Sequence, residues 1–450
     1  MPELTTRAQP ALEFLPPNFN PLVLRLCRTF MPLWMRWKTP IADIEVEGGD
    51  RLIELFQQFH QQKVRFLVAF RHPNPDDPIA LSQVFWRRIP DLAKSQNISL
   101  PDFFHLHFIY DRGIPLWAGN SVTWLFPKLG GSSILRGTMD RPGLKSARHL
   151  FVNGRFPIAA APEGATNGHN QRVSPLEPGI AQMGFWCVED LRKLNRNETV
   201  AIVPLNVQYH YLNDNWPALE ALLSGMEKDC GLSSQNRSPN FDKLYRRLIR
   251  LGNHLLNVME NFYRQFYHQD IPKSSETDTL KTRLDRLLDI ALGVAEAYFA
   301  VKATGDLTSR CRRLEQAGWE YIYRDDLKSR EELSPVDRGL ADRVAEEASL
   351  RMWHMRLVES FVAVTGEYIR ENPSFDRFAD TTIIIWTVVA RLKGTDPGKT
   401  PNLGKQLVKT KVCDPISVSD RCDDYKASRR KAIADLTRDL QLALEGAIEH

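Results

Sequence analysis

The sequence predicts an α/β protein in which a mostly parallel sheet is flanked by helices. The first observation is a nearly continuous apolar run, VRFLVAF, at residues 64–70. Such a run is typical of a strand that is buried on both faces, as in a parallel sheet. The second observation is that strand-like runs alternate with helix-like stretches as far as Tyr211, which is the pattern of βαβ units.

The expected elements follow in order along the chain. The expected strands are 64–70, 104–110, 132–136, 157–161 and 200–207, and the helices between them are 78–88, 142–153 and 178–194. Pro73 and Pro75 prevent a helix directly after the first strand, and Asp77-Pro78 is a good helix start. Ligands bind at the carboxyl ends of strands in such sheets, so the residues that follow these strands are the candidates for function.

An N-terminal amphipathic helix is expected from Asn20 and Pro21, an N-cap and first-turn pair. Pro32 is expected to kink or split it. One side carries large apolar side chains, the other carries arginines, and residues 21–38 contain no acid: Leu22, Leu26, Phe30, Leu33, Trp34 and Trp37 against Arg25, Arg28 and Arg36. Two interpretations remain open: a helix in a membrane interface, or a helix packed on the protein's own core with its basic side in water.

Residues 216–392 read as a large helical region. The clearest helices are 242–267, 280–301 and one that begins at Ser334-Pro335, with a polar linker at 269–279. Four aromatic residues with helical spacing and one histidine are assigned to structural, core positions: Phe262, Tyr263, Phe266, Tyr267 and His354. Residues 394–400 have too few residues between their glycines for a phosphate-binding loop, and we interpret them as a linker.

Composition and charge exclude other classes of protein. Lys and Arg number 59 and Asp and Glu 55, a net charge of +4, which argues against a nucleic-acid-coating protein. The six cysteines form no CxxC pair, so we expect no zinc knuckle, no disulfide framework and a reducing compartment. The longest apolar run, Ile383 to Ala390, is far shorter than the roughly 18 residues that span a bilayer.

The first candidate for chemistry is the pair His72 and Asp77, in the proline-rich loop after the strand 64–70. A carboxylate that holds one imidazole nitrogen fixes the tautomer and raises the basicity of the other nitrogen. Because no G-x-S-x-G elbow supplies a nucleophile, this base is expected to act on a hydroxyl of the substrate. The alternative is that Asp77 only caps the following helix and His72 is a polar loop residue.

Two further clusters follow expected strands. Residues 130–136 (GGSSILR) deliver Arg136 after two glycines, and residues 161–168 (APEGATNG) form a turn with Glu163 and several backbone amides. An arginine fork and a nest of backbone amides can together hold a phosphate.

In this order and spacing, the motifs resemble the glycerolipid acyltransferase family, which includes 1-acyl-glycerol-3-phosphate and glycerol-3-phosphate acyltransferases. The matches are His72 and Asp77 for H-x-x-x-x-D; Gly130, Ile134 and Arg136 for G-x-x-F-I-x-R; Pro162, Glu163 and Gly164 for F-P-E-G-T; and Val203 and Pro204 for V-P. The chain departs from the family at Asn74, where a serine is usual, and at Thr166-Asn167, where an arginine is frequent. Arg172 is close enough in sequence to supply that charge.

The tail resembles the end of the same domain. Residues 406–418 are expected to form an edge strand, in which Pro415 and Ile416 match the family's G-x-P-I, and 424–448 the closing helix. The implied organisation is a membrane-interface segment at 1–44, an acyltransferase core at 45–225, a helical insertion at 226–404, and the closing strand and helix at 405–450.

The resemblance implies a membrane-associated O-acyltransferase. It would move a fatty acyl group from acyl-CoA or acyl carrier protein to a hydroxyl of a lysophosphatidate-like acceptor, on the cytoplasmic side of a membrane, with no cofactor and no metal. The implied catalytic residues are His72 and Asp77, the implied acceptor-binding residues are Arg136, Glu163, Gly164, Thr166 and Arg172, and the membrane contacts are Arg25, Trp34 and Trp37. The alternatives are glycerol 3-phosphate or another lysolipid as acceptor, or a lipid-binding scaffold with a vestigial site.

Overall fold

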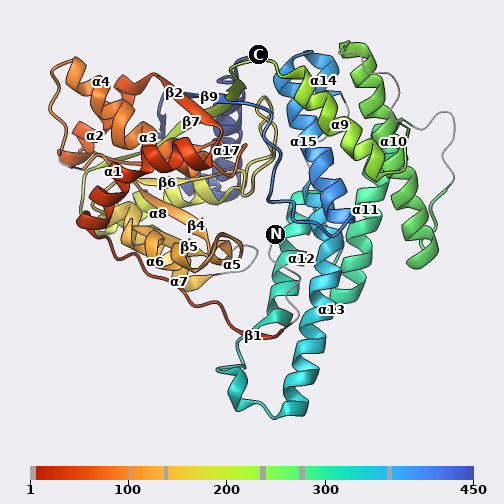
Figure 1. Cartoon of the computed structure of the whole chain (residues 1–450). Helices are drawn as coiled ribbons and strands as arrows, with labels where there is room; N and C mark the ends of the chain where they lie inside the picture. Colours follow the sequence, from red (N-terminus) through yellow and green to blue (C-terminus); the bar gives the residue numbers. More distant parts are fainter. Residues whose placement is uncertain (1–6, 102, 136–139, 234–239, 273–278, 362–366) are drawn as a thin grey trace. The chain divides into compact units, whose positions relative to one another are not determined.

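The computed structural model describes residues 7–101, 103–135, 140–233, 240–272, 279–361 and 367–450. The strands form a mostly parallel sheet flanked by helices (Figure 1), and 57% of the chain is helical. The predicted α/β class is therefore confirmed. Among the described helices, none is both long enough and apolar enough to cross a membrane.

The chain divides into two compact units that are discontinuous in sequence. The sheet unit comprises Phe14–Leu135, Asp140–Asn213 and Gly404–His450, and the helical unit comprises Asp214–Leu403 with the described residues up to Glu13. Residues 14–44 thus belong to the sheet unit, and the helix that begins at Trp216 belongs to the helical unit.

The strand order of the sheet is β2-β9-β7-β3-β6-β4-β5, and β10 pairs with β7 beside the end of β9. The bounds are β2 (Ile41–Glu47), β3 (Val64–Phe70), β4 (His107–Asp111), β5 (Gly131–Ile134), β6 (Ile158–Ala160), β7 (Thr199–Tyr211), β9 (Gln406–Val412) and β10 (Ile416–Ser417). Strands β7, β3, β6, β4 and β5 are parallel, so their carboxyl ends share one edge of the sheet. We call this edge the carboxyl edge.

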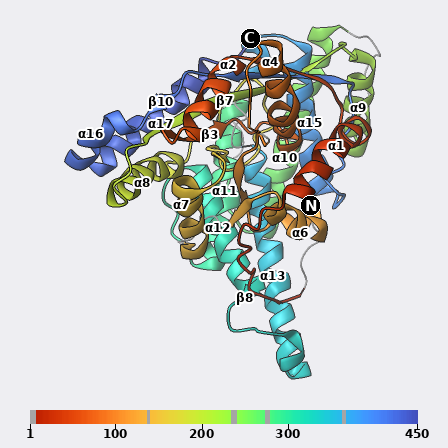
Figure 2. The same ribbon diagram turned by 90° about the vertical axis from the view of Figure 1, so that its left-hand side faces the viewer.

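Helices cover both faces of the sheet. One face carries α1 (Pro21–Lys38), α2 (Gly49–His60), α3 (Asp77–Gln83), a π-helical turn (Val84–Arg88) and α4 (Ile89–Ser95). The other carries α7 (Arg141–Asn153), α8 (Gly179–Lys193), α16 (Cys422–Ala427) and α17 (Arg429–Glu445), with α8 and α17 side by side (Figure 2). Phe66 and Val68 of β3 pack into the first layer, and Leu67 and Ala69 into the second. This double burial explains the continuous apolar sequence of β3.

The prediction that residues 406–418 form an edge strand is wrong. Strand β9 lies between β7, to which it is antiparallel, and β2, to which it is parallel. The edge strand beside it is β2 (IADIEVE), in which apolar residues alternate with acidic ones and only Ile41 and Ile44 are buried. Because its partner follows in the sequence only after the whole helical unit, local sequence patterns do not reveal this pairing.

Pro204 lies inside the central strand β7, a position that proline normally avoids because it lacks an N–H. The carbonyl of Pro204 accepts a hydrogen bond from the Cys413 N–H at 2.9 Å. The missing N–H therefore faces the same side, where β9 has ended at Val412 and β10 has not yet begun at Ile416. The proline stands where the sheet requires no donor from β7.

The helical unit contains α9 (Trp216–Asp229), α10 (Phe241–Phe266), α11 (Leu280–Phe299), α12 (Leu307–Ile322), α13 (Pro335–Glu359), α14 (Tyr368–Glu371) and α15 (Phe375–Leu392), and β1 (Gln9–Pro10) pairs with β8 (Tyr323–Arg324). Helix α13 begins at Pro335 with Ser334 as its N-cap, which confirms the prediction. Tyr263 is buried and bonds to the imidazole of His354. The core assignment of Phe266 is wrong: this last residue of α10 is 64% exposed.

The central position of β9 gives a test. Thr410 is buried and is paired with Val207 of β7 on one side and Val46 of β2 on the other. We expect Thr410→Pro to lower the free energy of unfolding by about 3 kcal/mol or more, because proline removes a ladder donor. Thr410→Val keeps the backbone N–H and loses only the hydrogen bond from the Thr410 hydroxyl to the Glu45 carbonyl, so it is the control for the side chain. Urea unfolding followed by circular dichroism measures both, and equal midpoints would contradict a central β9.

Candidate functional site

The site is built on the segment that follows β3. Strand β3 ends at Phe70, and the prolines at 73, 75 and 78 delay the next helix until Asp77, the first residue of α3. The intervening loop is held locally, because the Asp77 N–H donates to the Asn74 carbonyl at 3.1 Å and the Asp76 N–H to Asn74 Oδ1 at 3.0 Å. His72 therefore lies at the carboxyl edge, just above the end of a buried strand.

His72 and Asp77 meet across this loop. His72 Nδ1 lies 2.8 Å from Asp77 Oδ2, and the same oxygen accepts the Asn74 N–H at 3.0 Å. The Asp77 side chain is fully buried, whereas the His72 side chain is 23% exposed. The N-cap position of α3 is Asp76, and Asp77 does not cap the helix. The alternative that Asp77 only caps α3 is therefore wrong.

This geometry prepares His72 to act as a base. A carboxylate accepts hydrogen bonds, so the proton of neutral His72 is assigned to Nδ1 and the lone pair to Nε2. Among the described residues, none forms a hydrogen bond with Nε2. The imidazole thus has one nitrogen fixed by the buried carboxylate and a second nitrogen available to a ligand.

Glu163 connects the third motif to the first. Its carboxylate is 2% exposed. Oε1 accepts the backbone N–H of His72 at 2.9 Å, and Oε2 accepts Asn167 Nδ2 at 2.9 Å and the Ser174 N–H at 2.8 Å. Both oxygens are therefore used by the protein itself, and Glu163 fixes the backbone of His72.

Arg71, the residue before His72, also holds Glu163 and the loop that follows it. Its side chain is fully buried, and its Nε lies 4.0 Å from Glu163 Oε1. Its guanidinium donates to the carbonyls of Asn170 at 2.7 Å and of His169 and Arg172 at 2.8 Å. A buried charge requires such partners. Arg71 therefore holds the loop 169–172 against the end of β3.

The predicted acceptor-binding residues differ in their surroundings. Gly164 has a φ of +72°, and a Cβ there would lie 2.2 Å from Glu177 Oε1, so this position requires glycine. Thr166 is exposed in the same turn. The side chain of Arg172 is half-buried, and its carbonyl is held by Arg71. Arg136 lies outside the described residues.

Burial and charge shift the pKa of two groups beside the pair. Burial and the neighbouring charge of Asp77 raise the pKa of the Asp76 carboxyl to about 6. Burial and Asp77 also raise the pKa of the Tyr209 phenol, which therefore stays protonated and donates to Asp77 Oδ1 at 2.6 Å. Sequence patterns missed Tyr209 and Arg71. The sequence signal for Arg71 was a charged residue next to His72, whereas the expected strand 200–207 ends before Tyr209, which β7 includes in the structure.

The N-terminal helix forms as expected, and Pro32 is accommodated in one continuous helix. Leu24 is buried, and Val23, Cys27, Met31 and Met35 pack beside it against the sheet unit's core. The six predicted apolar side chains lie on another side of α1 and are 48% to 83% exposed: Leu22, Leu26, Phe30, Leu33, Trp34 and Trp37. We call these six residues the apolar face.

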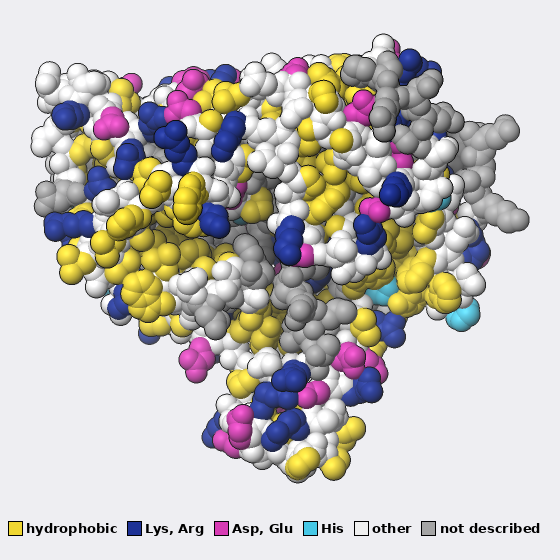
Figure 3. All heavy atoms as spheres, in the orientation of Figure 1, with side chains coloured by type: hydrophobic (Ala, Val, Ile, Leu, Met, Phe, Trp, Pro, Cys, Tyr) yellow, Lys and Arg dark blue, Asp and Glu magenta, His cyan; other side chains and the backbone are white. Residues whose placement is uncertain are grey.

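The charges around the apolar face are unequal. Arg25 and Arg36 are exposed. Arg28 is half-buried and donates to the Trp86 carbonyl at 3.2 Å, so it does not lie in water with Arg25 and Arg36. Trp124 of α6 (Asn120–Lys128) is 59% exposed, and the Asn20 N–H bonds to the Lys128 carbonyl, which brings the end of α6 beside the start of α1. Figure 3 shows apolar side chains gathered where α1 and α6 lie.

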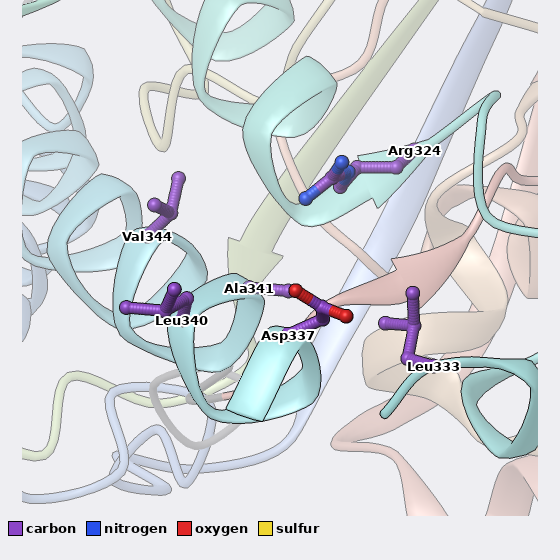
Figure 4. Close-up of a pocket in the computed structure, with 6 residues that line it drawn as sticks. All are labelled: Arg324, Leu333, Asp337, Leu340, Ala341 and Val344. Atoms are coloured by element: carbon purple, nitrogen blue, oxygen red, sulfur yellow. The ribbon is translucent and has the colours of Figure 1, made fainter. Parts of the chain in front are cut away.

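A shallow pocket lies within the helical unit. This shallow pocket of about 350 Å³ is lined by Arg324, Leu333, Asp337, Leu340, Ala341 and Val344 (Figure 4). Most of the lining comes from α13, and Arg324 comes from β8 and pairs with Asp326. Its lining contains no histidine, cysteine or hydroxyl side chain, and Asp337 is its one carboxylate.

The chain is similar over a short stretch to a curated protein, the F-box protein CPR1 of Arabidopsis thaliana. The two are 34% identical over 95 residues, which are 20% of this chain and 19% of that protein. The chain thus spans about a fifth of this relative, which is too little to carry an argument about activity. No family model and no solved structure matches the chain.

The three hydrogen bonds that the Glu163 carboxylate accepts give a stability test. In Glu163→Gln, one oxygen becomes an amide NH₂ that faces N–H donors, so we expect the free energy of unfolding to fall by about 2–3 kcal/mol. Thermal unfolding measures the change. Glu189→Gln is the matched control, since Glu189 forms an ion pair with the exposed Arg429 and surface pairs contribute little. An unchanged melting temperature in Glu163→Gln would show that its carboxylate does not hold the loop.

Proposed function

We propose that this chain is a membrane-associated O-acyltransferase of the glycerolipid type. The observation that carries the proposal is the His72–Asp77 pair, with Nδ1 held at 2.8 Å by a buried carboxylate and with a partly exposed ring. The motif resemblance supplies the reaction class, and the location of the pair at the carboxyl edge supports it, because ligands of such sheets bind there.

The proposed reaction balances with the residues of the site. His72 Nε2 takes the proton of an acceptor hydroxyl, and that oxygen attacks the carbonyl carbon of an acyl thioester. The carbon–sulfur bond breaks, and the thiolate of coenzyme A or of acyl carrier protein takes the proton back from the imidazolium. An oxygen ester and a free thiol result. Asp77 stabilises the imidazolium in between, and no covalent acyl-enzyme is needed.

Glu163 is given a different role from the one that the resemblance implies. The resemblance implies that it binds the acceptor, but its two oxygens already accept three N–H groups of the protein. We therefore assign Glu163 to holding the His72 backbone. Arg136, with the turn that contains Gly164 and Thr166 and with Arg172, remains the proposed set for an acceptor phosphate.

The preferred acceptor is a lysophosphatidate-like glycerolipid, because the apolar face fits a chain that takes its substrate from a bilayer. An exposed stripe of leucine, phenylalanine and tryptophan with arginines at its border is typical of interfacial helices. Helix α1 also packs directly against α3, which begins with Asp77. Arg25, Trp34 and Trp37 are the proposed membrane contacts. Glycerol 3-phosphate and other lysolipids remain alternative acceptors.

Acyl transfer tests the reaction. We expect labelled palmitoyl-CoA or palmitoyl-acyl carrier protein to acylate lysophosphatidate or glycerol 3-phosphate, and His72→Ala to lower the rate by about 10²–10⁴-fold, because the general base is lost. His149→Ala is the matched control, since His149 is exposed on α7. Equal rates for His72→Ala and wild type would overturn the assigned base. No product from any donor and acceptor pair would favour the scaffold alternative.

Vesicle binding tests the apolar face. We expect Leu26→Glu with Trp37→Glu to weaken binding to anionic phospholipid vesicles by about tenfold or more, since each buried side chain contributes about 1.5–3 kcal/mol. Leu442→Glu on α17 is the control, because Leu442 is similarly exposed at 58%. Co-sedimentation measures binding. The interfacial role is refuted if the double variant and the control bind alike.

A further inference from the structure

Tyr209 closes the buried side of the candidate site. It lies on β7 beyond Leu205, the last residue of β7 that pairs with β3. Its backbone is fixed by pairing with Val408 of β9 and by a 2.9 Å hydrogen bond from its N–H to Asn170 Oδ1. Its side chain is fully buried. The extension of β7 past its neighbour thus carries a phenol to the far side of Asp77.

The Asp77 carboxylate divides its two oxygens between different donors. Oδ2 receives His72 Nδ1–H and the Asn74 N–H, and Oδ1 receives the Tyr209 hydroxyl at 2.6 Å. Among the described residues, no other donor is present for Oδ1. A short O–H···O⁻ bond is strong and draws negative charge toward its own oxygen. The phenol therefore competes with His72 for the charge of Asp77.

We propose that Tyr209 is a positioning residue that fixes the Asp77 carboxylate and, through it, sets the proton affinity of His72. The inference rests on the proposed function for its catalytic meaning, because only a working base needs a tuned proton affinity. The Tyr209 hydroxyl bonds to Asp77 Oδ1, and His72 Nδ1 bonds to the other oxygen, Asp77 Oδ2, so the link from Tyr209 to His72 runs through Asp77.

The other groups that face this cluster are known. Asp76 precedes Asp77 on the same loop, Glu163 accepts the His72 N–H, and Arg71 lies 4.0 Å from Glu163. Phe70 presents its ring edge-on to the imidazole, with centroids 6.0 Å apart. A substitution at Tyr209 replaces none of these groups, so we attribute a changed titration of His72 to the loss of the Tyr209–Asp77 bond.

The test is the titration of His72 in the whole chain by NMR with ¹⁵N-labelled histidine, with the signal assigned by its loss in His72→Gln. In Tyr209→Phe, the Asp77 charge concentrates on the oxygen that faces His72. We expect the pKa of His72 to rise by about half a unit, a threefold change in proton affinity. Tyr425→Phe is the matched control, since Tyr425 is also buried and its hydroxyl accepts a hydrogen bond from Gln182, away from Asp77 in the helix layer on the other face of the sheet.

A second substitution reverses the expected direction. Site-specific 3-fluorotyrosine at position 209 keeps the ring and makes the hydroxyl a stronger donor, so the pKa of His72 should fall. This variant also covers the case in which Tyr209→Phe does not fold. A pKa of His72 that is unchanged by either substitution, or that moves against these directions, would overturn the proposal.

The titration needs no substrate, which separates this inference from the proposed reaction. If acyl transfer is found, the acid limb of the pH–rate profile should move to higher pH in Tyr209→Phe and stay in place in Tyr425→Phe. If the titration shifts as expected but no acyl transfer is found, the positioning role of Tyr209 is supported and the proposed reaction is wrong. If acyl transfer is found but neither the titration nor the acid limb moves, the role of Tyr209 is wrong.

Discussion

The bond from the His72 N–H to Glu163 Oε1, 2.9 Å long, is the contact on which the candidate site depends. It joins the end of β3 to the turn after β6, two segments that are neighbours in the sheet and far apart in the chain. A buried carboxylate is expensive unless its oxygens are satisfied, and here three N–H groups and Arg71 satisfy it. The same bonds that make its burial tolerable fix the backbone that presents His72.

The sheet, covered by helices on both faces, buries one side of the His72–Asp77 pair and leaves the other side open to solvent. Helices on both faces bury β3 from Val64 to Ala69, so the polar groups of the site reach solvent past the carboxyl end of this strand. Tyr209 and Asp77 are fully buried at the carboxyl edge, and the imidazole of His72 remains partly exposed. Helix α1 uses one side to pack on this core and leaves its apolar face outside, as the proposed action on substrates held in a bilayer requires.

The sequence was informative wherever a local rule decides the structure. The apolar run of β3, the proline-rich loop after it and the cap of α13 follow from burial and backbone constraints. Local rules fail where distant segments meet. Nothing near Asp77 distinguishes a helix cap from a partner of His72, because Tyr209 lies far along the chain. The central place of β9 and the inward direction of Glu163 likewise depend on strands and loops from other parts of the sequence.

The most direct test of the account is the tautomer of His72. Nitrogen chemical shifts of ¹⁵N-labelled histidine, recorded at a pH where the ring is neutral, report which nitrogen carries the proton. The account predicts a protonated Nδ1, held by Asp77, and an unprotonated Nε2 that is ready to accept a proton. A protonated Nε2 and a bare Nδ1 would contradict it, because His72 would then have no lone pair on the side that faces a ligand.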